Sequence, residues 1–473
     1  MGLNHLMHPR NIYKDKPPDF KILAQKYEKF RKFAIFSPNG QVSLDFHNPE
    51  AVRCLTETLL KEDFNLDVIL PKDALVPRIP QRLNYILLIE DLLMSSGIND
   101  DVIGIDIGTG PSCIFPLLGS DHCGWKFCAT EINEESMNIA KTNVKNNGLE
   151  TKITVIRGHE SSFFREVLGS NREVTFCFSM CNPPFFDKEE CEAKFQVSEE
   201  GEFTNIPGRT EDFRRHGPMS ATIAKSSELW VRGGEVAFVT RMIRESQIFR
   251  NRIKLFTSLI GKKKSIAPLK RVLDEIRFVF FTSHPISQGK TQRWVLVWTF
   301  DPTAKVHTEM MKRFLTVPPL EDNPISYFSR FCEFAGIVTE KHVSGVLMCF
   351  IPAYAIGFKP WKHKTEFIDN EPSAKRSKLR FVDNYTQTEF NNDLDCSSLC
   401  TSGDINVIEK GESSNDILIQ CCYHPQKSFN SRNFRVIVSR NQNFLEVEFL
   451  QSDDLGFRWL ETNFNYYREN IRV

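Results

Sequence analysis

The sequence predicts an α/β protein built on a doubly wound, mostly parallel sheet, followed by a smaller α+β carboxyl-terminal domain. Two observations support this fold class. Strand and helix signals alternate between residues 79 and 302, which is the pattern of parallel strands joined by helical crossovers. The chain also has 473 residues, more than one hydrophobic core usually covers, and its composition changes beyond residue 302.

Each expected element of the sheet is a short apolar run that ends in a polar or glycine-rich turn. The clearest is 102–107, a buried strand followed by the Gly-Thr-Gly turn that starts at Gly108. A helix is expected from 134 to 147, because Gly148 ends a run with helical periodicity. Further strands are expected at 125–130, 153–156, 174–180, 234–240 and 293–300.

Composition divides the chain into four expected segments. Residues 1–78 form a basic amino-terminal segment, and residues 79–302 form the α/β domain. Residues 362–414 are rich in Ser, Asp, Asn and Glu, which predicts a disordered linker or insertion. The smaller domain therefore combines 303–361 with 415–473. Within it we expect a strand-rich stretch at 336–358, strands at 417–421, 434–439 and 444–449, and a helix at 454–467.

The bulk composition is that of a water-soluble protein. Hydrophobic residues make up 41% and charged residues 25% of the chain. No apolar run approaches the roughly 20 residues that a spanning helix requires, so no membrane partner is expected. The amino terminus has no signal-peptide pattern, which predicts an intracellular protein. The basic stretch 375–378 fits a short nuclear-import pattern, so the nucleus is the expected location, with the cytoplasm as a second one.

Cysteine spacing argues against a metal site. The chain has 13 cysteines, an odd number that does not suit a disulfide framework. The close pairs Cys177/Cys181 and Cys421/Cys422 lack a second pair of ligands at metal-binding spacing. We therefore expect no metal cofactor.

Charge is balanced overall but unevenly distributed. The formal net charge is zero, yet basic residues gather in two places. One is the first thirty or so residues, which include Arg10, Lys14 and Lys16, and the other is the run Lys262 to Lys264. Either block is an ordinary solvated face or a surface for nucleic-acid phosphates, and two such blocks around one catalytic motif favour RNA.

A glycine-rich turn after a buried strand predicts a cofactor site. Gly108 and Gly110 let backbone N–H groups approach a ligand closely. Glu131 lies 23 positions beyond Gly108, where a carboxylate accepts hydrogen bonds from both hydroxyls of a ribose. Position 113 is Cys113, so the third glycine of the dinucleotide fingerprint is absent. S-adenosylmethionine is therefore the expected cofactor, and a plain turn is the alternative.

The most specific motif is residues 182–186, Asn-Pro-Pro-Phe-Phe, which follow the strand expected at 174–180. An adenine amine is a poor nucleophile because its lone pair is delocalised into the ring. The Asn182 side-chain oxygen and the Pro183 carbonyl can accept its two N–H groups and free that lone pair. Pro184 stiffens the loop, and Phe185 can stack on a flipped-out base. The alternative is a proline-rich turn with buried aromatic rings.

At these residues the chain resembles the methyltransferase-like protein 16 family, the U6 small nuclear RNA N6-adenosine methyltransferases. The resemblance covers roughly residues 7–300. The segments that carry it are 13–20 (Tyr-Lys-Asp-Lys-Pro-Pro-Asp-Phe), 82–86 (Arg-Leu-Asn-Tyr-Ile), 104–110, 181–186, 261–263, 267–270 and 288–289. The amino-terminal and lysine segments are not general methyltransferase features, which makes the resemblance specific.

The resemblance implies a class I (Rossmann-like) methyltransferase that uses S-adenosylmethionine. It also implies a structured RNA partner: U6 small nuclear RNA and hairpins in pre-mRNA for S-adenosylmethionine synthetase. The implied cofactor residues are Arg82, Gly108, Gly110, Ser112, Glu131, Ser162 and Asn182. The implied catalytic residues are Asn182, Pro183, Pro184 and Phe185. RNA contacts are expected at Arg10, Lys14, Lys16, Phe186, Lys262, Lys263 and Lys264.

Two places depart from the family pattern. Ser162 stands where the family has threonine, and Ser161 where it has a lysine in a loop over the pocket, so the gating of the cofactor is open. The stretch 204–218, with Arg209, Arg214 and Arg215, differs from the family's proline-rich basic loop, which leaves substrate contacts there open.

Two other functions compete with RNA methylation. A protein glutamine methyltransferase also presents an Asn-Pro-Pro-aromatic motif to a planar nitrogen, and an RNA-binding protein could keep this fold without turnover. The carboxyl-terminal part mixes basic and aromatic residues, which suits an RNA clamp or a protein-interaction module. The sequence identifies no protein partner, no oligomeric state and no particular target adenosine.

Overall fold

A computed structural model shows two compact units, Met1–Glu309 and Met310–Val473, and each is considered by itself. The structure describes residues 4–194, 196–197, 203–205, 222–289, 291–306, 311–316, 324–341, 347–351, 432–438, 444–449 and 454–470. Among the helices of these residues, none is both long and apolar enough to cross a bilayer. The arginine-containing loop at 206–218 and the expected linker at 362–414 lie outside the described residues, as does the strand expected at 417–421.

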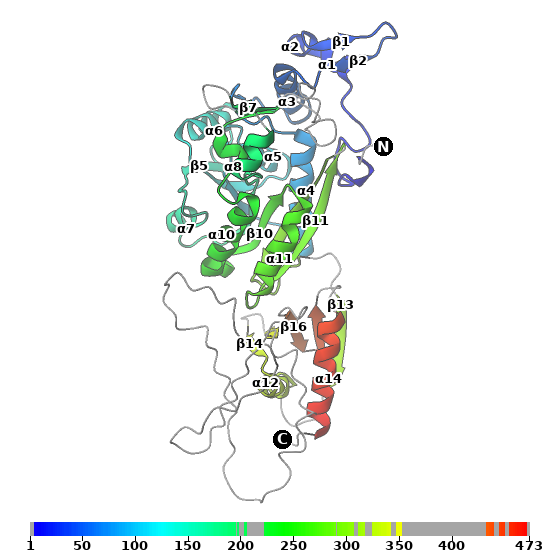
Figure 1. The fold of residues 1–473 in the computed structure, drawn as a ribbon, viewed down its shortest axis with the longest axis vertical. Helices are drawn as coiled ribbons and strands as arrows, with labels where there is room; N and C mark the ends of the chain where they lie inside the picture. The colour runs from blue at the N-terminus through cyan, green and yellow to red at the C-terminus, as the bar shows by residue number, and fades with distance from the viewer. Residues whose placement is uncertain are drawn as a thin grey trace, which may run out of the picture. The chain divides into compact units, whose positions relative to one another are not determined.

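The first unit is built on a seven-stranded sheet with the order β11-β12-β10-β6-β3-β4-β5. Figure 1 labels β5, β10 and β11 of this sheet. The five neighbouring strands from β10 to β5 pair in parallel. Strand β12 is antiparallel to both of its neighbours, β10 and β11. Their bounds are β3 Ile103–Ile107, β4 Lys126–Glu131, β5 Ile153–Arg157, β6 Phe176–Cys181, β10 Ile253–Ile260, β11 Phe280–Gln288 and β12 Thr291–Thr299. The doubly wound, mostly parallel sheet predicted from the sequence is therefore confirmed.

Helices cover the sheet and complete its core. Their bounds are α4 Ile79–Ser95, α5 Ile114–His122, α6 Glu134–Asn146, α7 Arg165–Ser170, α10 Gly234–Phe249 and α11 Ile266–Asp274. Helix α4 packs on β11, and α10 packs on β10. Fully buried apolar side chains of α10 and α11 meet the strands in one cluster that includes Val239, Leu269, Phe256 and Trp298. This burial is what holds the strand ends of the site in place.

The strand order reverses at β3, because β4 pairs with one edge of β3 and β6 pairs with the other. In open α/β sheets, ligands bind beyond the carboxyl ends of the strands at such a switch point. The turn after β3 and the loop after β6 therefore face the same crevice.

The prediction of a strand at 234–240 is wrong, because these residues form the first half of helix α10, Gly234–Phe249. A short buried apolar run does not distinguish a strand from a helix by itself. The buried positions Val239, Met242, Ile243 and Ser246 recur at three- and four-residue spacing, which places them on one helix face. The strands β10 and β11 supply sheet positions that the sequence did not predict.

The amino-terminal segment folds on the same unit. It contains η1 Asn4–Leu6, α1 Phe20–Lys26, α2 Glu28–Arg31, the hairpin β1 Ala34–Phe36 and β2 Val42–Leu44, and α3 Pro49–Phe64. Asp19 and Asn48 cap α1 and α3 by accepting backbone N–H bonds. Lys26 pairs with Glu62 and Lys29 with Glu57, so part of the positive charge seen in the sequence is neutralised by α3.

A small insertion follows the loop after β6. It contains α8 Lys188–Lys194, the three-stranded sheet of β7 Gln196–Val197, β8 Phe203–Asn205 and β9 Thr222–Ala224, and α9 Ser226–Leu229. Cys191, Ala224 and Leu229 form its buried centre, against which Leu75 and Phe186 pack. The insertion is thereby fastened beside the loop that follows β6.

In the second unit, the described residues form an antiparallel sheet and the helices α12 and α14. Its strand order is β13-β17-β16-β15-β14, with bounds Met311–Thr316, Phe444–Phe449, Arg432–Val438, Leu347–Ile351 and Val338–Lys341. Helices α12 Pro324–Phe334 and α14 Asp454–Asn470 contribute Phe328, Phe331, Leu460 and Phe464 to one buried cluster with the sheet. The four-segment division expected from the sequence stays a prediction.

Candidate active site

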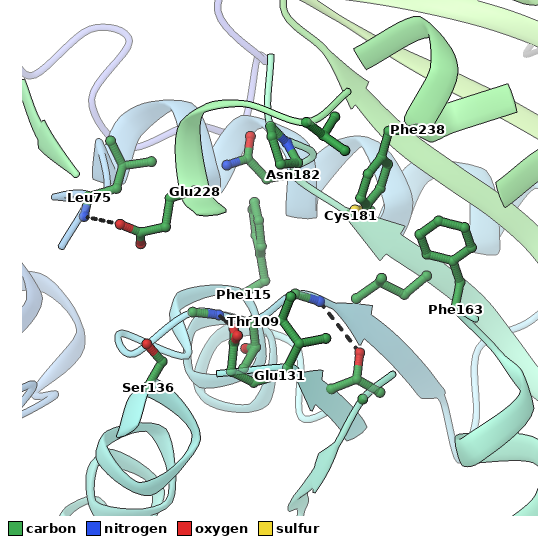
Figure 2. A pocket seen from close by; sticks show the side chains of 18 of the residues that line it. Leu75, Thr109, Phe115, Glu131, Ser136, Phe163, Cys181, Asn182, Glu228 and Phe238 are labelled. Atoms are coloured by element: carbon green, nitrogen blue, oxygen red, sulfur yellow. Dashed lines mark hydrogen bonds between the residues drawn. The ribbon is translucent and has the colours of Figure 1, made fainter. Parts of the chain in front are cut away.

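A cavity of about 410 Å³ lies beyond the carboxyl ends of β3, β4 and β6 (Figure 2). Its wall includes each of the seven residues expected at the cofactor: Arg82, Gly108, Gly110, Ser112, Glu131, Ser162 and Asn182. Pro184 also lines it, whereas Pro183, Phe185 and Phe186 lie outside the lining set. The structure therefore brings the two sequence motifs, which are about seventy residues apart, onto one cavity.

The glycine turn begins directly after β3. Gly108 has φ of 68° and Gly110 has φ of 65°, which are left-handed conformations that glycine adopts without steric cost. Thr109 N donates to the Thr130 carbonyl oxygen at 2.9 Å, which ties the turn to the end of β4. Cys113, at the place of a third glycine, is also left-handed with φ of 51° and opens helix α5. The turn is thus rigid and exposes main-chain groups to the cavity.

Glu131 ends β4 on the floor of the cavity. Its carboxylate accepts hydrogen bonds from Gly110 N and Asn133 N, each at 2.9 Å. The side chain is buried, and burial raises the pKa of this carboxyl, while the backbone N–H bonds oppose that rise. The arrangement fixes a carboxylate with remaining lone pairs beside the glycine turn, as hydroxyl recognition requires.

Arg82 brings a buried cation to the same cavity from helix α4. Its guanidinium lies 5.3 Å from the centre of the Phe115 ring. Burial lowers the pKa of Arg82 to about 10, and Arg293 and Arg78 add repulsion. Asp106, which is buried in β3, has two carboxylate oxygens without hydrogen-bond partners in the described part of the chain, and burial raises its pKa to about 7. Such groups are typical of a site built for a charged ligand.

The loop after β6 places an unsatisfied acceptor at the cavity. Asn182 Oδ1 is buried and has no hydrogen-bond partner among the described residues. Pro183 is buried, so the loop cannot swing freely into solvent. A buried carbonyl oxygen that lacks a donor costs about 1–3 kcal/mol, and native structures keep such groups mainly where a ligand supplies the donor.

Two aromatic rings follow Asn182, and each packs against a basic residue. Phe185 lies so close to Gly261 that a Cβ there would be 2.7 Å from the ring, and Arg293 lies 5.4 Å from the ring centre. Phe186 is held by main-chain bonds with Leu229 and Val231, at 3.1 and 3.0 Å. Lys262 Nζ lies 4.9 Å from the centre of its ring. The loop is therefore clamped between α9 and the lysine run.

Tyr85 of α4 supports the same loop from the protein interior. Its hydroxyl lies 2.7 Å from Thr257 Oγ1 and accepts a long bond of 3.5 Å from Cys181 N. Thr257 in turn donates to the Ser179 carbonyl oxygen at 2.7 Å. Tyr85 also meets the cavity residue Phe115 edge-on at 5.4 Å. One helix thus carries both Arg82 and a support for the end of β6.

The lysine run is organised by Glu235 of α10. The Glu235 carboxylate accepts bonds from Gly261 N at 2.6 Å, Lys262 N at 3.0 Å and Ser265 Oγ at 2.6 Å. Both Lys262 and Lys264 pair with Glu190. Burial by itself would raise the pKa of Glu190, but the hydrogen bonds from Lys262 and Lys264 outweigh it and lower the pKa to about 2. Lys263 and Lys264 are exposed, and Lys262 is largely covered.

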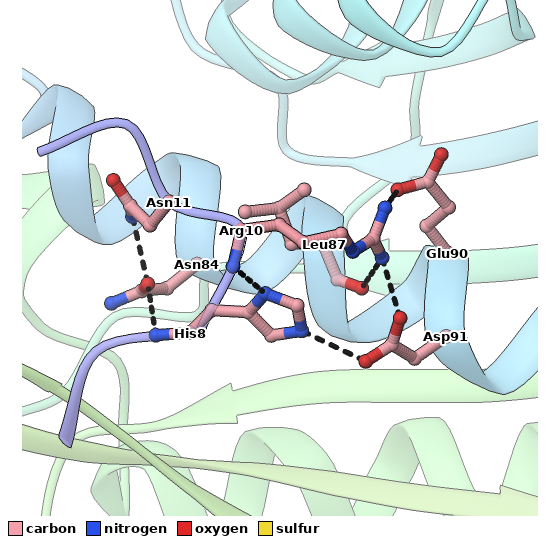
Figure 3. Close-up of polar contacts among 7 residues, drawn as sticks. All are labelled: His8, Arg10, Asn11, Asn84, Leu87, Glu90 and Asp91. Carbon is pink, nitrogen blue, oxygen red and sulfur yellow. Dashed lines mark hydrogen bonds and ion pairs between the residues drawn. The ribbon is translucent and has the colours of Figure 1, made fainter. Parts of the chain in front are cut away.

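The amino-terminal candidates differ in how available they are (Figure 3). Arg10 forms ion pairs with Glu90 and Asp91 of α4, so its charge is already partnered. Lys14 is half-buried and Lys16 is exposed, and neither forms an ion pair within the described residues. Among the three, the two lysines are the better placed to meet phosphates.

The segment around Arg10 is anchored on Asn84, a fully buried residue of α4. Asn84 Oδ1 accepts hydrogen bonds from His8 N at 3.0 Å and from Asn11 Nδ2 at 2.7 Å (Figure 3). Asn84 Nδ2 donates to the Ser287 carbonyl oxygen at 2.8 Å. Three separate parts of the chain therefore meet at one amide.

Ser162 lines the cavity, whereas the preceding residue, Ser161, is exposed and lies outside the lining set. Ser162 Oγ donates to the Glu166 carboxylate at 2.6 and 2.7 Å, and Ser161 Oγ lies 2.8 Å from His159 Nδ1. Beside them Phe163 and Phe238 meet edge-on at 4.9 Å and form an apolar wall (Figure 2). Neither phenylalanine was predicted from the sequence to belong to the site.

Two further acidic residues were not predicted from the sequence: Glu228, which lines the cavity, and Asp106, which is buried in β3 behind it. Asp106 sits inside the apolar run of β3, where its polarity was a usable signal. Glu228 lies far along the chain on α9, and its position gave no signal at all. Among the described residues, no group of three or more His, Cys, Asp or Glu side chains is arranged to hold a metal ion.

The sheet order, the glycine turn, the acidic residue at the end of the second strand and the Asn-Pro-Pro-Phe loop together define a class I methyltransferase. A family model described as RNA methyltransferase matches residues 1–302. The chain belongs to this RNA methyltransferase family, and S-adenosylmethionine is its methyl donor. The resemblance stated from the sequence is thereby confirmed, and the protein glutamine methyltransferase alternative falls away.

Named relatives agree with this assignment. The chain is 42% identical over 383 residues to the U6 small nuclear RNA (adenine-(43)-N(6))-methyltransferase of Caenorhabditis briggsae, covering 80% of this chain and 79% of that protein. It is 46% identical to the protein of the same name from Caenorhabditis elegans, covering 65% of each. It is 41% identical to the RNA N(6)-adenosine-methyltransferase METTL16 of Homo sapiens, covering 66% of this chain but 54% of the relative.

A solved structure resembles the first unit in fold as well as in sequence. It is the crystal structure of the hMettl16 catalytic domain in complex with MAT2A 3'UTR hairpin 6, with 41% identity and a TM-score of 0.56. The match covers 64% of this chain and 99% of that chain.

Proposed function

We propose that this protein methylates the exocyclic N6 amine of an adenosine in a structured RNA, with S-adenosylmethionine as the methyl donor. The observation that carries the proposal is Asn182 Oδ1, a buried acceptor without a partner among the described residues, on the wall of the cavity that also holds the glycine turn. An amine that offers two N–H groups is the ligand such an acceptor lacks.

The residues around the cavity fit the methyl donor. Glu131 offers its carboxylate to the ribose hydroxyls, and Arg82 offers a buried cation to the carboxylate of the methionine part. Gly108, Gly110 and Ser112 present main-chain and hydroxyl groups, and Ser162 lies near the apolar wall that suits the adenine ring. When bound, S-adenosylmethionine supplies an electrophilic methyl group at its sulfonium.

Asn182 and Pro183 act on the acceptor amine. The Asn182 side-chain oxygen and the Pro183 carbonyl accept its N–H groups, which draws the nitrogen toward a tetrahedral shape and frees its lone pair. Pro183 and Pro184 restrict the backbone, so the acceptors are held in place before the substrate arrives. Methyl transfer needs no general base, since the methylated amine loses its proton afterwards.

We propose that the aromatic and basic residues around the Asn-Pro-Pro-Phe-Phe loop bind the RNA. Phe185, which packs against Gly261 and Arg293, is the ring proposed to stack on the flipped adenine, an interaction of about 1–3 kcal/mol. The exposed Lys263 and Lys264 and the amino-terminal Lys14 and Lys16 are proposed to contact phosphates. Lys262 and Phe186 support the loop, and Arg10 anchors the amino-terminal segment.

The names of the relatives suggest the substrate class. They point to U6 small nuclear RNA, and the matched crystal structure holds a hairpin of the MAT2A 3'UTR. We propose substrates of both kinds, and a nuclear location follows because U6 RNA is a nuclear molecule. A cytoplasmic pool stays a prediction.

A methylation assay with labelled S-adenosylmethionine tests this function. U6 RNA, short hairpins and unstructured RNAs of equal length are compared, and the products are digested to nucleosides. We expect label in N6-methyladenosine, mainly from the structured RNAs. Label in another nucleoside, or equal transfer to RNAs in which each adenosine is replaced, would contradict the proposal.

A further inference from the structure

A second carboxylate, Glu228 of α9, lines the cavity opposite the Glu131 side (Figure 2). Nothing in the motif that defines the cofactor site calls for it. It belongs to the insertion after the Asn-Pro-Pro-Phe loop, so it reaches the cavity from a different part of the chain than Glu131 does.

The Glu228 carboxylate is held in one orientation. Its Oε2 atom accepts Leu75 N and Lys225 N, each at 3.0 Å. Its Oε1 atom forms no hydrogen bond within the described residues and lies 4.0 Å from where a Cβ on Gly110 would be. One oxygen is therefore used to anchor the side chain, and the other is presented to the glycine turn.

Within the described residues Lys225 forms no ion pair with Glu228, although its charge opposes the rise in the pKa of that carboxyl. Lys225 directs its ammonium to Asp73 at 3.0 Å and to Glu135 at 2.8 Å. Glu131 faces the same space and repels a second negative charge. The cavity is also lined by Arg82, His159, Glu160 and Arg241. Burial, helped by Glu131 and opposed by the two backbone N–H bonds, raises the pKa of Glu228 to about 7.

A carboxylate in this position gains most from a positively charged ligand. The methyl donor carries a sulfonium and has one net positive charge, whereas the product S-adenosylhomocysteine has a neutral thioether and no net charge. In a cavity of low effective dielectric constant, that difference acts over several ångströms. Resting on the proposed function, we infer that Glu228 makes the cavity prefer the cationic donor over its neutral product.

The inference predicts a link between donor binding and protons. A bound cation stabilises the ionised carboxylate, so the donor lowers the pKa of Glu228 and releases protons near neutral pH. Donor affinity should therefore be highest above about pH 7.5 and fall as the pH drops toward 6, as Glu228 becomes protonated. Product affinity should change much less over the same range.

Calorimetry of the full-length protein tests this. Dissociation constants for S-adenosylmethionine and S-adenosylhomocysteine are measured between about pH 6 and about pH 8, in two buffers of different ionisation enthalpy. For Glu228→Gln at about pH 8 we expect donor binding to weaken about fivefold or more and product binding to change less than about twofold. The proton release on donor binding should shrink.

Glu135→Gln is the matched control. It makes the same chemical change on the same rim, but Glu135 is 70% exposed and faces Lys225 rather than the cavity. We expect both dissociation constants to stay as in the wild type. A thermal melt of each variant verifies the fold. If Glu228→Gln unfolds, the pH series on the wild-type protein keeps the inference testable, because a donor affinity that does not fall between about pH 8 and about pH 6 contradicts it.

The outcomes separate this inference from the proposed function. If both ligands bind and respond equally to pH and to Glu228→Gln, Glu228 only anchors its segment, and the charge preference is wrong. If neither ligand binds the wild-type protein, the proposed function itself fails, and this inference fails with it.

Discussion

The two sides of the cavity are built in different ways. On the cofactor side, main-chain N–H groups of Gly110 and Asn133 already satisfy the Glu131 carboxylate. On the acceptor side, Asn182 Oδ1 is buried and lacks a partner in the described part of the chain. The first arrangement stabilises the folded protein, whereas the second costs stability and is repaid when a substrate binds. The difference separates residues that hold the donor from residues that act on the amine.

The largest effect is expected for Asn182→Ala, which removes the unsatisfied acceptor. The rate of methyl transfer should fall by about 10² to 10³-fold, as for the loss of one preorganised polar group in other active sites. Donor binding, measured by calorimetry, should change little, because Glu131 and the glycine turn remain. Turnover within tenfold of the wild type would show that Asn182 does not act on the amine.

Glu131→Ala reverses that pattern on the cofactor side. Loss of charge-assisted bonds to the ribose hydroxyls should weaken donor binding by about 1.5–3 kcal/mol, roughly ten- to a hundredfold. The melting temperature should also fall, because Gly110 N and Asn133 N lose their acceptor. Equal donor affinity in the variant and the wild type is the result that contradicts this role.

Tyr85→Phe tests how strongly the two sides are coupled through α4. The Cys181 N–H and the Thr257 hydroxyl lose their shared partner, a change of about 1 kcal/mol, so kcat should fall several-fold with donor affinity unchanged. Tyr27→Phe, which removes a hydroxyl bonded to Glu62, is the matched control and should leave kcat as it is. A loss of donor affinity instead would assign Tyr85 to the cofactor wall.

The smallest effect is expected for the paired substitution of Lys263 and Lys264 by alanine. RNA affinity should fall, and the slope of log affinity against log salt should decrease by about 1 to 2, since each phosphate contact contributes about 0.7 to 0.9. Lys126 and Lys145, which are exposed elsewhere, serve as the control pair. Weaker binding with an unchanged slope would place these lysines away from the RNA backbone.

The cofactor motif was predictable because its chemistry is local. Gly108 and Gly110 follow a buried strand, and Glu131 ends the next one, so topology alone brings them together. Asn182 was predictable for the same reason, because β6 is the other neighbour of β3.

The parts that sequence reasoning missed depend on contacts between distant segments. Glu228 meets Leu75 across about 150 positions, and no spacing rule connects them. Phe238 lies in the run that resembled a strand, and only its place on α10 turns it toward the cavity. The ion pairs of Arg10 were equally hidden, since its partners Glu90 and Asp91 lie on α4.

The anchoring of the amino-terminal segment on Asn84 has a practical consequence for anyone who shortens this protein. A version that starts after Asn11 removes both donors to Asn84 Oδ1, which is fully buried on the helix that carries Arg82 and Tyr85. We expect the loss of these two bonds to weaken the packing of that helix. A loss of activity in the shortened enzyme would therefore not reveal whether the missing residues contact RNA, because a disturbed helix α4 also affects the methyl-donor cavity.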